Sequence, residues 1–314
     1  MTPGEAGLAV DAPEEMSAGG GPSARLLVEV DGVPMSALLR EVPDPRAVVL
    51  ALHGGATTSL YYDAPNRPRL SLLRAGAALG FTVLALDRPG YGASAPYAAE
   101  LDSAARRVDL AFTAVERMLE SRPRGAGVFL MAHSSGCELA VRMAGDGRGA
   151  DLLGLELAGT GRHRHERAMR LWEEWRGRER EARDGLRDIL WGPARFYPDD
   201  LVGGAAVSAS APAYEGVESE AWPHDLPGFA SRIPVPVHYS LGDHEMWWRS
   251  GPPALEDVAS LFTASPRVAV HEQADGGHNL SLGYSAPAYH LEVLSFVEEC
   301  VLARENADAE RKKN

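Results

Sequence analysis

Residues 127–144 read GVFLMAHSSGCELAVRMA, and this stretch decides the fold. An apolar, strand-like run comes first, and small and apolar residues at helical spacing come last. Between them, Ser134 has Ala132 two positions before it and Gly136 two positions after it, with alanine in place of the usual first glycine. A sharp strand-to-helix turn needs small residues at both places, because larger side chains would clash. The stretch therefore predicts a nucleophile elbow at Ser134, with Ser135 as the alternative nucleophile.

The composition is that of a globular protein with enough apolar residues for a full core. The 314 residues are 45% hydrophobic and 24% charged, and the formal net charge is −13. This negative charge argues against wholesale binding to nucleic acid or to an anionic membrane. Cys137 and Cys300 form no metal or redox motif and fit a reduced, intracellular chain. No stretch approaches the roughly 20 apolar residues of a membrane span. We therefore expect a cytoplasmic protein.

Apolar strand-like runs alternate with helical patterns through most of the chain. A hairpin signal at residues 31–32 comes first and predicts an antiparallel start. The continuous apolar strands that follow predict an α/β fold, with a mostly parallel central sheet covered by helices on both faces. The predicted strands are 47–52, 81–86, 128–131, 152–157, 235–240 and 267–271, and the predicted helices are 68–79, 101–120, 137–144, 254–263 and 286–303.

A long stretch separates the last two predicted strands from the others, and it exceeds the length of a loop in a compact sheet. Residues 162–187 carry nine arginines against six acids, with Leu171, Trp172 and Trp175 on one helical face. The tryptophans either hold this stretch on the core, line a pocket or contact a partner. We expect a helical lid over the catalytic end of the sheet. The expected division is a flexible leader at 1–23, a core at 24–160 and 233–303, the lid at 161–232 and a flexible tail at 304–314.

Two further residues are predicted to complete a nucleophilic triad. A serine hydroxyl needs a base within hydrogen-bond reach, and the base needs a carboxylate to orient it. In folds with a nucleophile elbow, the acid and the histidine follow the serine in that order. Asp243 follows the predicted strand at 235–240, and His278 follows the strand at 267–271 behind two glycines. Asp243 is therefore the predicted acid and His278 the predicted base.

Other polar residues compete for these roles. Glu245 and Asp275 are the alternative acids. His133 is the variable residue of the elbow and is expected to point sideways. His271 falls within a predicted strand, where a packed side chain is expected. His244 follows the predicted acid and is expected at the pocket.

Acyl transfer also needs donors for the negative charge that develops on the carbonyl oxygen. One is the backbone N–H that follows the nucleophile, at Ser135. The second is expected from residues 53–58, HGGATT, which follow the first buried strand. Glycines let the backbone approach the reacting carbon, and Gly55 is the predicted donor. The residues expected to line the substrate site are His53, Gly54, His133, Trp172, Trp175 and His244.

Together these residues resemble those of the α/β-hydrolase superfamily, and in particular a serine hydrolase of that superfamily with an inserted lid. Residues 87–94, DRPGYGAS, are similar to the Asp-x-x-Gly-x-Gly-x-Ser turn of that family. The resemblance covers residues 26–302, and the lid matches in position rather than in sequence. It implies the α/β-hydrolase fold with a Ser-acid-His triad. Epoxide hydrolases and haloalkane dehalogenases of the family carry Asp as nucleophile, so Ser134 argues against both.

The predicted function is cleavage of an ester-type bond (ester, thioester or lactone) of a small molecule, through an acyl-enzyme on Ser134. No cofactor and no metal are expected. The expected partner is a small-molecule acyl substrate, anionic or carrier-bound if the arginine-rich lid attracts it. The alternatives are a non-hydrolytic acyltransferase, lyase or cyclase, a proline-iminopeptidase-like amidase, and a ligand-binding receptor that retains the triad. The acyl group, the pathway and the oligomeric state stay open.

Overall fold

The fold is built on one eight-stranded sheet in the order β1-β2-β4-β3-β5-β6-β7-β8. It is seen in a computed structural model that describes residues 23–175 and 183–313. The pairs β1–β2 and β2–β4 are antiparallel, and all later pairs are parallel, which confirms the predicted sheet. The strands are β1 (Ala24–Val30), β2 (Val33–Arg40), β3 (Val48–Leu52), β4 (Thr82–Leu86), β5 (Val128–His133), β6 (Gly154–Ala158), β7 (Val237–Gly242) and β8 (Val268–Gln273).

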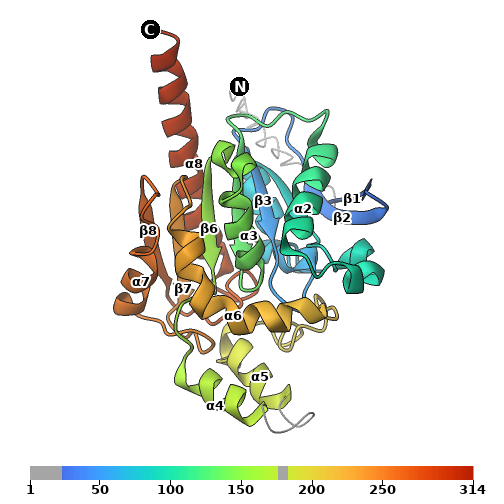
Figure 1. Ribbon diagram of the computed structural model, residues 1–314, viewed down its shortest axis with the longest axis vertical. Helices are drawn as coiled ribbons and strands as arrows, with labels where there is room; N and C mark the ends of the chain where they lie inside the picture. The colour runs from blue at the N-terminus through green and yellow to red at the C-terminus, as the bar shows by residue number, and fades with distance from the viewer. Residues whose placement is uncertain (1–22, 176–182, 314) are drawn as a thin grey trace, which may run out of the picture.

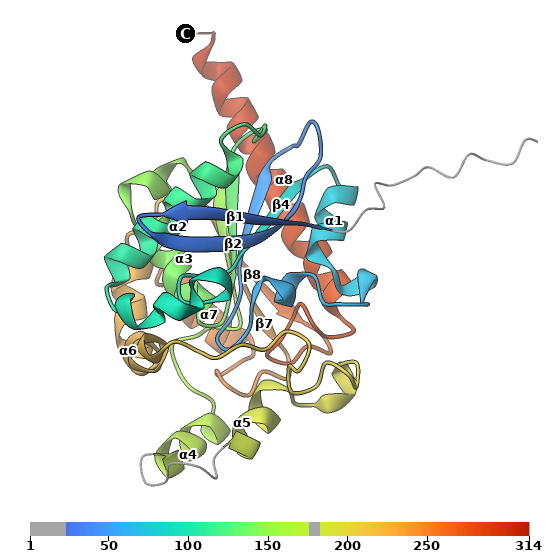
Figure 2. The same ribbon diagram turned by 90° about the vertical axis from the view of Figure 1, so that its right-hand side faces the viewer.

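The antiparallel start is a tight hairpin, which crosses the front of the molecule in Figure 2. Its two turn residues, Asp31 and Gly32, both have positive φ, at 49° and 77°. Such a turn matches the right-handed twist of the flanking strands, and Asp-Gly is a favoured sequence for it. The predicted hairpin is therefore confirmed.

Helices cover both faces of the sheet (Figure 1). Alternate residues of β3 belong to two different apolar clusters: Val48, Leu50 and Leu52 to one, and Val49 and Ala51 to the other. The first cluster contains residues of α2 and α3, and the second contains residues of α1 and α8. Both faces of the strands are thus buried, as continuous apolar runs require. The helices of the core are α1 (Leu72–Ala78), α2 (Ala104–Leu119), α3 (Gly136–Ala144), α7 (Pro252–Ala259) and α8 (Ala286–Arg311).

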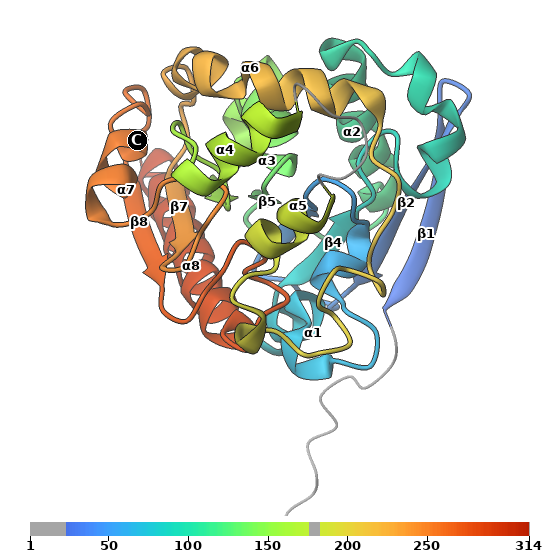
Figure 3. The same cartoon turned by 90° about the horizontal axis from the view of Figure 1, so that it is seen from below.

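We call residues 159–236 the β6–β7 segment, and its described helices lie beyond the carboxyl ends of the parallel strands. This segment contains α4 (Glu166–Trp175), α5 (Arg183–Leu190) and α6 (Ala213–Ala230). Figure 1 shows all three at one end of the sheet, and Figure 3 views the molecule from that end. Ligands bind at this end of parallel sheets, so the segment is placed beside any site there.

α6 is an 18-residue helix although it contains Pro223 and Pro227. A proline has no N–H, so the carbonyl four residues before it loses its helical partner. For Pro223 that carbonyl belongs to Ser219, and the Arg164 guanidinium donates a hydrogen bond to it instead. Proline leaves this carbonyl without a helical partner, and a side chain of the same β6–β7 segment replaces that partner.

α8 continues to Arg311, so residues 304–311 of the predicted flexible tail are helical. Alanine, glutamate and arginine dominate this stretch, and all three favour helix. In addition, the Arg46 guanidinium contacts the carboxylates of Glu298 and Glu305 at 2.7 and 2.6 Å. These two glutamates lie two turns apart on α8, so one side chain ties the extension to the core. Across residues 23–175 and 183–313, no helix is both long and apolar enough to cross a membrane.

Candidate active site

Ser134 occupies a strained turn between β5 and α3. Its φ is +51°, a left-handed conformation that a non-glycine residue rarely adopts. The backbone N–H of Ser134 donates to Ala158 O at 2.8 Å, and Ser134 O accepts from Cys137 N at 2.9 Å, which fixes the turn. A Cβ on Gly136 would lie 2.5 Å from His53 O, so only glycine fits there. This geometry is that of the predicted elbow, and Ser134 is partly exposed at its tip.

A continuous hydrogen-bonded chain runs from Ser134 through His278 to Glu245. His278 Nε2 lies 3.0 Å from Ser134 Oγ, and His278 Nδ1 lies 2.9 and 3.1 Å from the two carboxylate oxygens of Glu245. A carboxylate can only accept, so Nδ1 carries the proton and Nε2 is free to accept from the serine hydroxyl. Glu245 is itself held by the N–H groups of Trp247 and Trp248, at 2.7 and 3.4 Å.

The predicted acid, Asp243, does not contact His278. Its carboxylate lies 2.8 Å from His244 Nδ1 and accepts from the N–H groups of Asp275 and Gly276 at 3.2 and 3.0 Å. Partial burial alone would raise the pKa of Asp243, but these hydrogen bonds outweigh burial and hold the pKa below its ordinary value. The geometry therefore places the alternative acid, Glu245, and not Asp243 against His278.

The two-residue shift has a local cause. Asp243 is the first residue after β7. Its carboxylate accepts hydrogen bonds from the backbone of the turn that joins β8 to His278. The chain then turns at residues 243–244, which brings Glu245 beneath the imidazole. Glu245 and His278 are each 2% exposed, so their contact is shielded from water. No pattern in the sequence distinguishes the two acids, because both follow the same strand.

The loop at residues 53–58 runs directly beside the elbow, as predicted. A Cβ on Gly54 would lie 3.2 Å from Ser134 Cβ, and one on Gly55 would lie 2.9 Å from Ser135 Oγ. Ser135 caps the N-terminus of α3, where the helix dipole favours negative charge. The predicted oxyanion donors, the N–H groups of Gly55 and Ser135, are thus brought close to Ser134.

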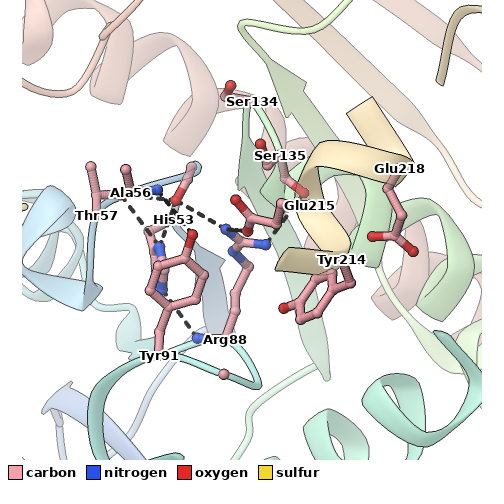
Figure 4. Close-up of polar contacts among 12 residues, drawn as sticks. His53, Ala56, Thr57, Arg88, Tyr91, Ser134, Ser135, Tyr214, Glu215 and Glu218 are labelled. Carbon is pink, nitrogen blue, oxygen red and sulfur yellow. Dashed lines mark hydrogen bonds and ion pairs between the residues drawn. The ribbon is translucent and has the colours of Figure 1, made fainter. Parts of the chain in front are cut away.

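Two residues at the site were not found from the sequence. Arg88, in the turn after β4, forms a buried ion pair with Glu215 of α6, with Arg88 Nη2 2.5 Å from Glu215 Oε1. Figure 4 shows this pair next to Ser135 and the 53–58 loop. A Cβ on Gly55 would lie 2.9 Å from Glu215 Oε2. Arg88 belongs to the DRPGYGAS turn and could have been suspected, whereas Glu215 lies in a proline-rich stretch without a signal.

The histidines predicted to line the substrate site are placed behind it instead. His53 is 0% exposed and contacts Gly54 O through Nδ1 at 2.8 Å. His133 is 3% exposed, and its Nε2 lies 2.8 Å from His278 O. Its ring also stacks on Tyr61, with the ring centroids 4.5 Å apart. Both therefore support the loops that carry the site.

The other predicted substrate contacts lie outside the triad. His244 is bound to Asp243, and its ring packs against Phe196 with centroids 4.8 Å apart. Trp172 contacts Trp247, and the Arg164 guanidinium lies 4.9 Å from the Trp172 ring. Burial lowers the pKa of Arg164 to about 10. The side chain of Trp175 lies outside the described residues.

No group of three histidine, cysteine, aspartate or glutamate side chains gathers as metal ligands in the described ranges of the chain. The polar side chains gathered near the elbow are those of Ser134, His278, Glu245, Arg88 and Glu215. A serine bound to a histidine that is bound to a carboxylate is an arrangement for nucleophilic catalysis.

The strand order and the turn at Ser134 are those of an α/β-hydrolase fold. The model of the alpha/beta hydrolase family matches residues 48–289, well over half of the chain. The chain belongs to this family. A comparison with curated protein sequences gives no significant match.

Solved structures of similar fold include several hydrolases at low sequence identity. A carboxyl esterase from Bacillus coagulans is 18% identical, with a TM-score of 0.63 over 90% of this chain and 99% of the other. The thioesterase domain from the curacin biosynthetic pathway is 19% identical, with a TM-score of 0.55 over 86% of this chain and all of the other. The N-acyl homoserine lactonase AidH is 18% identical, with a TM-score of 0.60 over 88% and 98%. At these identities the likeness concerns the fold.

Proposed function

We propose that the protein is a serine hydrolase that cleaves an ester-type bond of a small molecule through an acyl-enzyme on Ser134. The observation that supports this proposal is the chain of hydrogen bonds from Ser134 Oγ to His278 Nε2, at 3.0 Å, and from His278 Nδ1 to Glu245, at 2.9 Å. It ends at a partly exposed serine and is buried at its other end. Such a chain activates a hydroxyl that is a poor nucleophile on its own.

In the first half of the proposed reaction, Ser134 Oγ attacks the carbonyl carbon and its proton passes to His278 Nε2. Glu245 stabilises the imidazolium through the Nδ1–H hydrogen bond and stays ionised. The oxyanion of the tetrahedral intermediate accepts hydrogen bonds from the N–H groups of Gly55 and Ser135. The intermediate then collapses, the bond to the leaving group breaks, and His278 Nε2–H protonates the leaving group.

In the second half, water attacks the acyl-enzyme and gives a proton to His278 Nε2. The second tetrahedral intermediate uses the same two backbone donors. Its collapse breaks the bond between the acyl carbon and Ser134 Oγ, and His278 returns the proton to that oxygen. The products are the free acid and a regenerated serine. Ester, thioester and lactone carbonyls are the expected substrates, because their leaving groups need the least help.

The proposal includes a lid role for the β6–β7 segment. α6 is held beside the site by three polar contacts, two with the core and one with Thr160 of the same β6–β7 segment. Tyr214 donates to Pro89 O at 2.6 Å, Glu215 pairs with Arg88 and Trp222 Nε1 donates to Thr160 Oγ1 at 2.8 Å. A lid held in this way shields the acyl-enzyme and limits the groups that can enter.

A panel of activated esters, thioesters, lactones and amides tests the proposal, with Ser134→Ala as the control. We expect a burst of alcohol or thiol release by the wild type and a loss of turnover of about 10⁶-fold in Ser134→Ala. The variant should unfold at the wild-type temperature, because Ser134 is only partly buried. Equal turnover by both proteins would refute the acyl-enzyme on Ser134.

A further inference from the structure

Three donors converge on one carbonyl oxygen in the loop beside the elbow. Gly54 O lies 2.8 Å from His53 Nδ1, 3.0 Å from Thr57 Oγ1 and 3.0 Å from Arg88 Nη2. Figure 4 shows these three side chains around the loop. The C=O and N–H of a trans peptide point in opposite directions. Fixing the oxygen of Gly54 therefore fixes the direction of the Gly55 N–H, which is the proposed oxyanion donor.

His53 takes part in this arrangement as a neutral side chain. Gly54 O can only accept, so His53 Nδ1 carries a proton, and the backbone N–H of Arg88 donates to His53 Nε2 at 3.1 Å. Burial and the nearby Arg88 charge lower the pKa of His53 well below its ordinary value. Of the three donors to Gly54 O, only Arg88 is charged.

Arg88 connects three parts of the molecule through one guanidinium. Nη2 contacts Gly54 O of the loop and Glu215 Oε1 of α6, and Nη1 lies 3.5 Å from Ser135 O of the elbow. The side chains of Arg88 and Glu215 are 3% and 8% exposed. A pair this well buried has a definite geometry, and its removal from either side leaves a charge without a partner.

We infer that Arg88 is a positioning residue of the oxyanion hole and that Glu215 holds it in place, so that α6 and the Gly55 N–H are coupled. This inference rests on the proposed serine hydrolase. A charged donor on Gly54 O polarises the peptide that carries the Gly55 N–H and makes that N–H a stronger donor. Arg88 acts from behind the loop, since its own side chain is buried away from the substrate.

The test removes the pair without leaving a buried charge. Arg88→Met/Glu215→Leu is compared with wild type and with Arg142→Met, a matched control. Arg142 lies 3.5 Å from Glu218 of the same helix α6, and its guanidinium lies over the Phe229 ring. We expect kcat of the double variant to fall about 10²-fold, the order found when an oxyanion donor is lost. KM and the unfolding temperature should stay close to those of the control.

A boronic acid that forms a tetrahedral adduct with Ser134 distinguishes a positioning role of Arg88 from a merely structural one. Its inhibition constant should rise by the factor by which kcat/KM falls, whereas binding of an unreactive amide analogue of the substrate should not change. The single variants Arg88→Met and Glu215→Leu should be non-additive, because the two side chains act as a unit.

Two contrary results are distinguishable. A wild type that hydrolyses esters, together with a double variant of unchanged kcat and boronate affinity, would overturn the role of Arg88 and leave the serine hydrolase in place. A wild type whose Ser134 neither forms the boronate adduct nor turns over would overturn both.

Discussion

Two buried glutamate–histidine pairs in the described part of the chain differ in what surrounds them. At the ends of the strands, His278 Nδ1 lies 2.9 Å from Glu245, and its other nitrogen contacts the partly exposed Ser134. Inside the sheet, His238 Nδ1 lies 2.5 Å from Glu156, whose second oxygen accepts from the Tyr289 hydroxyl at 3.0 Å. The first pair ends at the partly exposed hydroxyl that we propose as the nucleophile. In the second pair, the Ser240 hydroxyl lies 3.3 Å from His238 Nδ1, the same nitrogen that faces Glu156, and Ser240 is fully buried.

The outer neighbour of a buried Glu–His pair determines whether the pair can take part in a reaction. Both pairs are almost inaccessible to solvent, with every member at most 2% exposed. The outer nitrogen of His238 lies 3.8 Å from the Glu292 carboxylate, which is not a nucleophile in this setting. We therefore expect changes to the pair at the strand ends to affect activity and changes to the pair inside the sheet to affect stability.

The largest expected effect lies in the catalytic pair. Glu245→Gln should lower kcat about 10⁴-fold, the order found when the acid of a serine triad becomes an amide. Asp243→Asn, two residues away, should lower kcat less than about 10-fold, because Asp243 contacts the turn and not His278. Steady-state kinetics on one ester measure both. A larger loss of kcat in Asp243→Asn than in Glu245→Gln would show that Asp243, as predicted from the sequence, is the acid.

Changes to the pair inside the sheet should lower the stability of the protein rather than its activity. Glu156→Leu leaves His238 and the Tyr289 hydroxyl without their acceptor, and it should lower the free energy of unfolding by about 3 kcal/mol. Denaturant unfolding measures this change, while kcat of the folded fraction should stay near wild type. Glu292→Gln is the matched control. The side chain of Glu292 is 50% exposed, so its loss should change stability by less than about 1 kcal/mol. A lower kcat in Glu156→Leu without a loss of stability would contradict the different roles that we expect for the two pairs.

The smallest expected effect is a pH dependence of stability. Burial alone would lower the pKa of His238, but the Glu156 and Glu292 carboxylates outweigh it and raise the pKa above its ordinary value. The contribution of His238 to stability is therefore fully present below the unfolded pKa of about 6.5 and is lost as the pH rises through the higher folded pKa. Unfolding measured from pH 6 to pH 9 should show this loss in the wild type and not in His238→Gln. An opposite slope would mean that His238 is neutral in the folded protein.

Much of the fold could be predicted from the sequence because the core strands are continuous apolar runs. The strand predicted at 81–86 is β4 at Thr82–Leu86, and the hairpin turn at Asp31 is where its sequence indicates. α6 could not be predicted, since Pro223 and Pro227 are typical of a loop, and the partner of the Ser219 carbonyl comes from a distant arginine.

The candidate site could be predicted only where local sequence determines local backbone. The turn at Ser134 and the glycines of the 53–58 loop meet that condition. The choice between Asp243 and Glu245 depends on a turn whose direction is set by contacts with the loop after β8. Glu215 contacts Arg88 only because α6 crosses the end of the sheet, and this packing depends on the tertiary structure rather than on local sequence.

We propose that Ser134, His278 and Glu245 form one catalytic unit. A fluorophosphonate that reacts with activated serines tests it directly, when the rate of labelling is followed by mass spectrometry of the peptide that contains Ser134. We predict stoichiometric labelling of Ser134 at similar rates in the wild type and Asp243→Asn, slow labelling in Glu245→Gln, and none in Ser134→Ala. Fast labelling in Glu245→Gln together with slow labelling in Asp243→Asn, or a label on another residue, would contradict the account.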